Sequence, residues 1–139
     1  MDDWCGLHND HDSLTGLTKA MYFDSEGKEI ENKDKDAGLY IYDRKGTVVK
    51  GKWNSNQLAF QIGEASQIHT AGLLVATPHL VKGSYGNVGR GTMACFMQPK
   101  WDVKMSPPKD SKIEDCNVNV LKEGMDFAQF SEKRLAEYY

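Results

Sequence analysis

Apolar and polar positions alternate along most of the chain. Short segments rich in apolar, β-branched or aromatic residues are separated by Gly, Asn, Asp or Ser, and they span residues 13–23, 38–43, 46–53, 57–63, 72–81 and 91–98. Side chains on a strand point alternately to its two faces, so this pattern predicts short β-strands. Many short strands with short turns favour an antiparallel sandwich or barrel over a sheet of βαβ units.

Three segments between or after these strands have a different character. Residues 44–46, Arg-Lys-Gly, fit a tight hairpin turn. Residues 24–36 are mostly charged with a single isoleucine, which predicts a solvated surface loop, with a substrate lid as the alternative. Residues 126–139 are predicted to form a helix that packs on the strands. Asp126 can cap its first turn, and an apolar stripe is offered by Phe127, Phe130 and Leu135.

Length and composition bound the architecture. The chain has 139 residues, of which 40% are hydrophobic. This is enough for one core, which we place in residues 1–105, followed by a Pro-containing linker and the helix over 106–139. We therefore expect a mainly β protein with a C-terminal helix.

The net charge and the cysteine content restrict the classes of partner and the cellular compartment that we expect for this protein. The net charge is −3 and no apolar run approaches the length of a membrane span, so neither a nucleic-acid nor a membrane partner is expected. The three cysteines are odd in number and far apart, which is typical of reduced thiols in a cytoplasmic protein.

The stretch HNDHD at residues 8–12 is the first candidate for chemistry. It can be a metal site, an acid/base cluster or a polar turn. On an extended segment His8 and Asp10 point to the same face and can hold one cation together. His79 is the best third ligand, because Pro78 fixes the backbone just before it and apolar residues lie on either side. Two imidazoles and one carboxylate suit Fe(II) with open positions, whereas the cysteines lack the spacing of a zinc site.

Each of these residues also has an ordinary structural interpretation. A His-x-Asp pair by itself is common by chance. His11 and Asp12 are expected to be turn or pocket-rim residues, and His69 a loop residue.

A second pair of residues, Arg90 and Thr92, strengthens the hypothesis of a metal site. Arg90 and Thr92 lie two apart, so on a strand they share a face and can bind a carboxylate. If their strand neighbours that of His79, an anion site lies beside the metal, as 2-oxoglutarate binding requires.

These motifs in this order resemble a known family. His8-Asn9-Asp10, GLYIYD, LAFQIGE, ATPHLV and RGTMACFMQP are similar to the 2-oxoglutarate and Fe(II)-dependent oxygenases, in particular the plant-type group that includes isopenicillin N synthase-like proteins. Longer stretches resemble a plant and protist subgroup of that superfamily, among them WCGLHNDHDSLTGL, GLLVATPH and FSEKRLAEYY. Departures are Gly63-Glu64 for Gly-Asp, Leu80-Val81 for Arg-Val, and Thr92 for serine.

The resemblance implies a double-stranded β-helix (jelly-roll, cupin-like) core. It implies that His8, Asp10 and His79 bind Fe(II), and that Arg90 and Thr92 bind the C5 carboxylate of 2-oxoglutarate. The activity implied is a dioxygenase that couples decarboxylation of 2-oxoglutarate to succinate with oxidation of an unidentified small molecule, supported in vitro by ascorbate. The cofactor does the chemistry and the protein positions it.

The resemblance also raises an expectation about the start of the chain. Members of the family carry helices and a core strand before His-x-Asp, whereas here His8 is near residue 1. We therefore expect a core that is incomplete at its N-terminus, completed by a missing segment or a second chain. A non-catalytic metal-binding or interaction module left by truncation is the alternative function. An iron oxidase that needs no 2-oxoglutarate is a third, against which the Arg90-x-Thr92 pair argues.

Overall fold

A computed structural model describes residues 3–138 and shows a mainly β protein. Its strands are β1 (Asp3–His8), β2 (Leu14–Leu17), β3 (Met21–Phe23), β4 (Glu29–Ile30), β5 (Gly38–Tyr42), β6 (Val48–Lys50), β7 (Ala59–Ile62), β8 (His79–Lys82), β9 (Gly89–Gly91) and β10 (Ala94–Met97). The helices are α1 (Glu64–His69), a 3-10 helix over Ile113–Cys116, and α2 (Phe127–Tyr138).

The chain divides into two compact units that alternate along the sequence. Unit 1 comprises the chain up to His8, Gly16–Phe60 and Pro78–Cys95. Unit 2 comprises Asn9–Thr15, Gln61–Thr77 and the chain from Phe96 onward. The predicted division at residue 105 remains a prediction.

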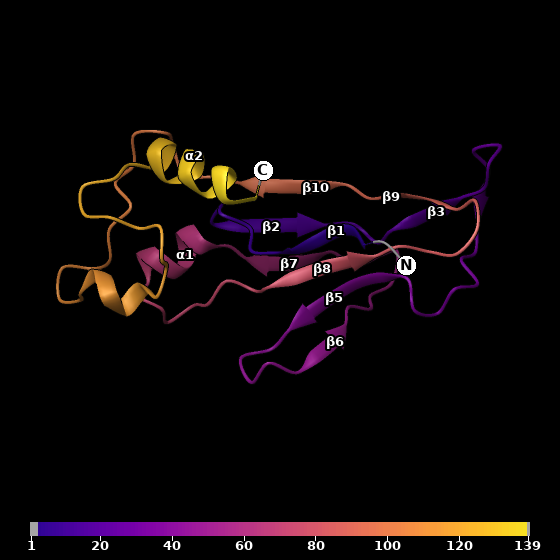
Figure 1. Cartoon of the computed structure of the whole chain (residues 1–139), viewed down its shortest axis with the longest axis horizontal. Coiled ribbons are helices and arrows are strands. Elements are labelled where there is room, and N and C mark those ends of the chain that lie inside the picture. Colours follow the sequence, from indigo (N-terminus) through magenta and orange to yellow (C-terminus); the bar gives the residue numbers. More distant parts are fainter. Residues whose placement is uncertain (1–2, 139) are drawn as a thin grey trace. The chain divides into compact units, whose positions relative to one another are not determined.

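Unit 1 holds two antiparallel sheets. One has the strand order β1-β8-β5-β6, and the other has the order β4-β3-β9. Strands β1, β8, β5 and β6 lie side by side in Figure 1.

The hairpin predicted at residues 44–46 is confirmed. It joins β5 to β6, the Asp43 carboxylate accepts hydrogen bonds from the backbone N–H groups of Lys45 and Thr47, and Gly46 has a φ of 78°. A third sheet in the chain has the order β10-β2-β7.

Unit 2 contains the helices and the larger apolar core. Its fully or nearly buried side chains come from α1, the 3-10 helix, α2 and the segments between them: Ala65, Ile68, Met105, Cys116, Leu121, Phe127 and Phe130. The predicted cap of α2 is confirmed, because the Asp126 carboxylate accepts a hydrogen bond from the Gln129 N–H and the Gln129 side chain accepts one from the Asp126 N–H. Burial of Phe127 and Phe130 fixes the face of α2 that packs inward.

Several sequence predictions need correction. Residues 13–23 form two strands rather than one, and residues 72–78 form none, so the strand begins only at His79. Leu135 is 43% exposed and does not extend the apolar stripe of α2. Arg134, a charged residue of α2 that would be expected on its polar face, is only 6% exposed. The loop over residues 24–36 is mostly exposed as predicted, although it contains the short strand β4.

No helix within residues 3–138 combines the length and the apolar character needed to span a bilayer.

Candidate metal centre

His8 and His79 are brought together by strand register. They are directly paired residues of the antiparallel strands β1 and β8, and paired residues project to the same face of a sheet. Their ring centroids lie 4.2 Å apart. His79 is 5% exposed, and the Nδ1–H of His8 donates a hydrogen bond to the Gly6 carbonyl oxygen at 2.7 Å. This hydrogen bond favours the tautomer of His8 that carries its lone pair on Nε2.

Asp10 is positioned by hydrogen bonds and not, as predicted, by the alternation of a strand. Strand β1 ends at His8, so Asp10 lies in the turn beyond it. Its Oδ2 accepts hydrogen bonds from the Thr15 hydroxyl at 2.5 Å and from the Gln61 amide at 3.2 Å. Its backbone oxygen accepts one from the Glu64 N–H at 2.8 Å. Asp10 is therefore buried, 8% exposed, and held on both its side chain and its backbone.

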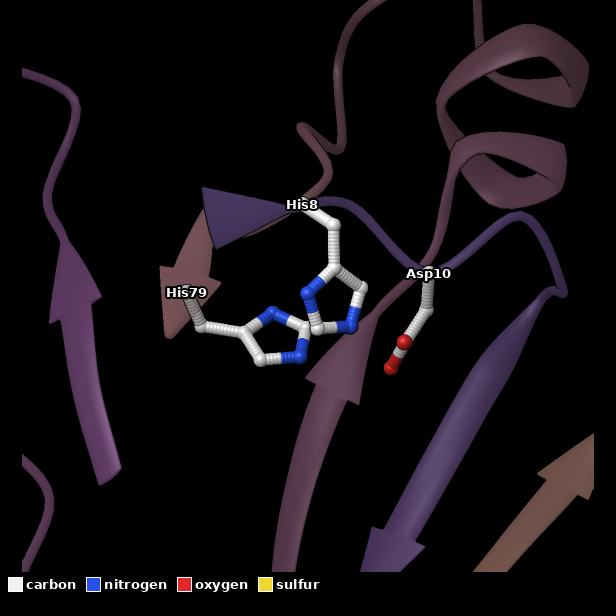
Figure 2. Close-up of side chains that lie close together, drawn as sticks. All are labelled: His8, Asp10 and His79. Atoms are coloured by element: carbon white, nitrogen blue, oxygen red, sulfur yellow. The ribbon is translucent and has the colours of Figure 1, made fainter. Parts of the chain in front are cut away.

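The three predicted ligands converge in the structure. His8, Asp10 and His79 each offer one ligand atom, and these atoms all lie within 4.8 Å of one another (Figure 2). Ligand atoms on one face of an octahedral ion are about 3 Å apart, because each bond is about 2.1 Å long. A bound ion would therefore draw the three donors inward. Two imidazole nitrogens and one carboxylate oxygen are a donor set that can hold Fe(II) and leave positions for other ligands.

The neighbouring pair His11 and Asp12 does not belong to this group. His11 Nε2 lies 3.0 Å from the Ser131 hydroxyl, and its ring stacks on Phe127. Burial lowers the pKa of His11, with the Arg134 charge adding to this and Asp10 opposing it. Asp12 lies in a bend, as predicted for a turn residue, but is only 1% exposed and so lies on no pocket rim.

Asp12 also has an unusual proton affinity. Burial raises its pKa from 3.8 to about 6, which the hydrogen bond from the Thr15 hydroxyl partly opposes. That hydroxyl is within reach of both Asp10 and Asp12, but it has one proton and donates to one carboxylate at a time. Asp12 is thus a buried structural carboxyl that shares a partner with Asp10.

His69 was predicted to be a loop residue. In the structure it is the last residue of α1. Its Nε2 lies 3.3 Å from the backbone oxygen of Lys104. It is not a member of the candidate metal group within residues 3–138.

Arg90 and Thr92 have different surroundings. The condition that their strand neighbours the His79 strand is not met, because β9 pairs with β3 and belongs to another sheet than β8. Arg90 is paired with Tyr22, and both side chains line a cavity of about 370 Å³ in unit 1. The Thr92 hydroxyl donates a hydrogen bond to the Thr18 backbone oxygen at 3.0 Å, and Thr92 is not among the described residues that line this cavity.

Sequence reasoning missed the residues that support the ligands. Thr15 and Gln61 hold Asp10, and both are almost completely buried. The sequence offers no signal for Gln61, because the alternation of LAFQIG places it on the face opposite to Phe60 and Ile62. In the structure Gln61 is buried and Phe60 is 59% exposed. Polar residues at inward strand positions need hydrogen-bond partners.

No protein-family model and no curated protein matches the chain. Solved structures do match.

A full-length Neurospora crassa protein in complex with alpha-KG and thymine has a TM-score of 0.68 at 20% identity, covering 99% of this chain and 38% of that one. Dioxygenase for auxin oxidation 1 from Arabidopsis thaliana, in a 2-oxoglutarate complex, has a TM-score of 0.59 at 23% identity, with coverage of 78% and 36%. JOX2 in complex with 2OG, Fe and JA has a TM-score of 0.64 at 18% identity, with coverage of 95% and 34%.

The chain thus spans about two fifths or less of the length of these structures. At these identities the likeness concerns the fold. The predicted fold class is confirmed: the chain has the mainly β, jelly-roll core found in the 2-oxoglutarate and Fe(II)-dependent oxygenases, with one long C-terminal helix.

Proposed function

We propose that this chain is the core of an Fe(II)- and 2-oxoglutarate-dependent dioxygenase, with His8, Asp10 and His79 as the iron ligands. The single observation that carries the proposal is the convergence of these three donors, within 4.8 Å of one another, in a chain with this fold. The finer assignment to the isopenicillin N synthase-like group rests on the sequence motifs alone.

The residues of the centre have separable tasks in this proposal. His8 and His79 present imidazole nitrogens from paired strands, and Asp10 supplies the single negative charge. Thr15 and Gln61 hold the carboxylate of Asp10 in one orientation. Hydrogen bonds of this kind raise the affinity of a metal centre because they fix its ligands before the ion binds.

Arg90 is proposed to bind the distal carboxylate of 2-oxoglutarate. Its guanidinium lines the unit 1 cavity, and its Nε is buried with no hydrogen-bond partner among the described residues. A carboxylate would supply that partner. Thr92 remains a proposed second contact, and to make it the hydroxyl would have to exchange its hydrogen bond with the Thr18 backbone.

When bound, the iron would supply the chemistry by which dioxygen oxidises both the primary substrate and 2-oxoglutarate, the latter to succinate and carbon dioxide. The primary substrate is proposed to be a small molecule. Solved structures of similar fold hold thymine in the Neurospora crassa protein and JA in JOX2.

The second chain or further segment expected to complete the sheet stays a prediction. So does the cytoplasmic location, which the absence of a disulfide among Cys5, Cys95 and Cys116 supports.

The test measures binding and turnover separately. Purified protein is titrated with Fe(II) and 2-oxoglutarate without oxygen, and then supplied with oxygen and ascorbate while succinate release is measured. The wild type should bind Fe(II) and release succinate, and Arg90→Ala should need a much higher 2-oxoglutarate concentration. Metal binding without succinate release would contradict catalysis by this chain and favour the non-catalytic module.

A further inference from the structure

The cavity of unit 1 gathers unsatisfied hydrogen-bond donors. Among the described residues, three buried side-chain nitrogens lack a hydrogen-bond partner, and all three belong to residues that line this cavity: Asn32 Nδ2, Trp53 Nε1 and Arg90 Nε. A buried donor without a partner costs free energy, so three around one cavity point to a ligand rich in acceptor atoms.

The charge of the lining points the same way. Five cationic residues line the cavity against one carboxylate, that of Asp34: Lys19, Lys35, Lys50, Lys52 and Arg90. Asp34 already accepts hydrogen bonds from the backbone N–H groups of Tyr85 and Asp36. The chain as a whole has a net charge of −3, so this positive concentration is local and favours an anion.

The orientation of Asn32 is set by its own contacts. Its Oδ1 accepts hydrogen bonds from the Ser84 hydroxyl at 2.9 Å and from the Asp34 N–H at 3.1 Å. Two donors on that atom identify it as the amide oxygen, so the partnerless atom is the NH₂ group. The 24–36 loop therefore contributes a fixed donor to the cavity.

Trp53 is held by close packing. A Cβ placed on Gly51 would lie 3.1 Å from Trp53 Cζ3 and 3.4 Å from a methyl group of Leu39. Gly51 thus lets the indole lie directly against the backbone. The indole N–H can only donate, so only an acceptor can satisfy it.

We propose that this cavity binds a small carboxylate anion, and that Asn32 and Trp53 are binding residues in addition to Arg90. The cavity, about 370 Å³, is of the size that small-molecule sites have. The proposal rests on the proposed function only for the source of the carboxylate, which is either 2-oxoglutarate itself or a separate acidic ligand. Binding by the metal-free protein is its direct consequence.

The experiment uses succinate as the probe and the full chain treated with a chelator. Calorimetric titration should show saturable binding. Trp53→Phe removes the N–H but keeps an aromatic ring and should weaken binding by about tenfold or more. Asn32→Asp keeps the accepting oxygen, replaces the donor by an anionic oxygen, and should weaken binding by about a hundredfold. Matched controls are Trp101→Phe, at a side chain that is 61% exposed in unit 2, and Asn54→Asp, which adds the same charge one residue from Trp53.

A second measurement needs no variant at the cavity. In the wild type, succinate should shift the NMR signal of one indole N–H, and Trp4→Phe and Trp101→Phe identify it by elimination as that of Trp53. Absence of binding, an unchanged Trp53 signal, or equal affinity of the folded Trp53→Phe and Asn32→Asp variants would overturn the proposal.

A competition experiment decides whether the carboxylate that the cavity binds is that of 2-oxoglutarate or that of a separate acidic ligand. If 2-oxoglutarate displaces succinate from Mn(II)-loaded protein, the carboxylate is that of the co-substrate; if both bind together, it belongs to a separate acidic ligand. Both results support an anion cavity. If the metal-free protein bound succinate but the protein showed no turnover of 2-oxoglutarate, the proposal of an anion-binding cavity would be supported and only the proposed catalysis would be contradicted.

Discussion

Arg134 and Glu64 form a buried ion pair with two hydrogen bonds. Arg134 Nε lies 2.7 Å from Glu64 Oε2, and Arg134 Nη2 lies 2.7 Å from Glu64 Oε1. Both side chains are largely shielded, 7% and 5% exposed. Asn9 donates a further hydrogen bond to the Glu64 carboxylate, so the pair joins α2 to the first residue of α1 and to the segment that leads into Asp10.

Replacing Arg134 should destabilise the protein in a pH-dependent way. Burial raises the pKa of Glu64 above its ordinary value of 4.5, and the Arg134 charge opposes that rise. A carboxyl group with a raised folded-state pKa favours the folded state below its unfolded pKa and loses that contribution as the pH rises. Arg134→Met leaves a buried, unpaired carboxylate and should cost about 3–5 kcal/mol near neutral pH.

The cost should shrink as the pH falls towards 4.5, because Glu64 then becomes protonated. Urea unfolding of variant and wild type across this range measures the difference. Glu137→Gln is the matched control, since Glu137 bonds the same guanidinium but is 42% exposed, and it should cost about 1 kcal/mol or less. An equal loss for Arg134→Met at every pH would contradict a role for the charge of Glu64.

Thr15 should tune the metal affinity without touching the ion. Thr15→Val keeps the shape of the side chain but removes the hydroxyl that bonds Asp10 and Asp12. Loss of such a supporting hydrogen bond typically lowers metal affinity by about 10- to 100-fold. Titration with Mn(II) measures this, and Thr47→Val on the exposed β5–β6 hairpin should leave the affinity unchanged.

Gly63 should tolerate no side chain. A Cβ there would overlap the backbone oxygen and Oδ1 of Asp12, and backbone cannot move aside cheaply. We expect Gly63→Ala to cost about 3 kcal/mol or more in thermal or chemical unfolding. Gly6→Ala is the control, because nothing lies within 4 Å of the Cβ it would add. Equal stability of both variants would mean that the turn at Asp12 adapts.

The strands, the hairpin and the capped C-terminal helix could be predicted because their signals are local. Alternation over GLYIYD and the Asp126–Gln129 spacing require no knowledge of distant residues. Helix α1 was missed because its six residues follow a strand pattern without a break, and its burial comes from packing in unit 2. Burial of Arg134 was missed for the same reason, since its partner Glu64 is 70 positions away.

For the site, the identity of the candidate ligands could be predicted but not the means that position them. His8 and His79 follow from motif and register. Asp10 lies beyond the end of β1, so strand alternation does not position it. Hydrogen bonds from Thr15 and Gln61 do so instead. Such contacts depend on tertiary packing, which a single sequence does not display.

His79 and His69 offer the sharpest comparison for the metal centre. Both are histidines near the end of a secondary-structure element, but only His79 belongs to the group whose donor atoms lie within 4.8 Å of one another. His79→Gln removes one of the three donors and should lower the affinity for Co(II) by at least about a hundredfold, a larger effect than loss of a supporting hydrogen bond. His69→Gln should leave the Co(II) affinity and its visible absorption spectrum unchanged. If the two variants bound Co(II) equally well, His79 would not be a ligand, and the proposed iron centre would fail with it.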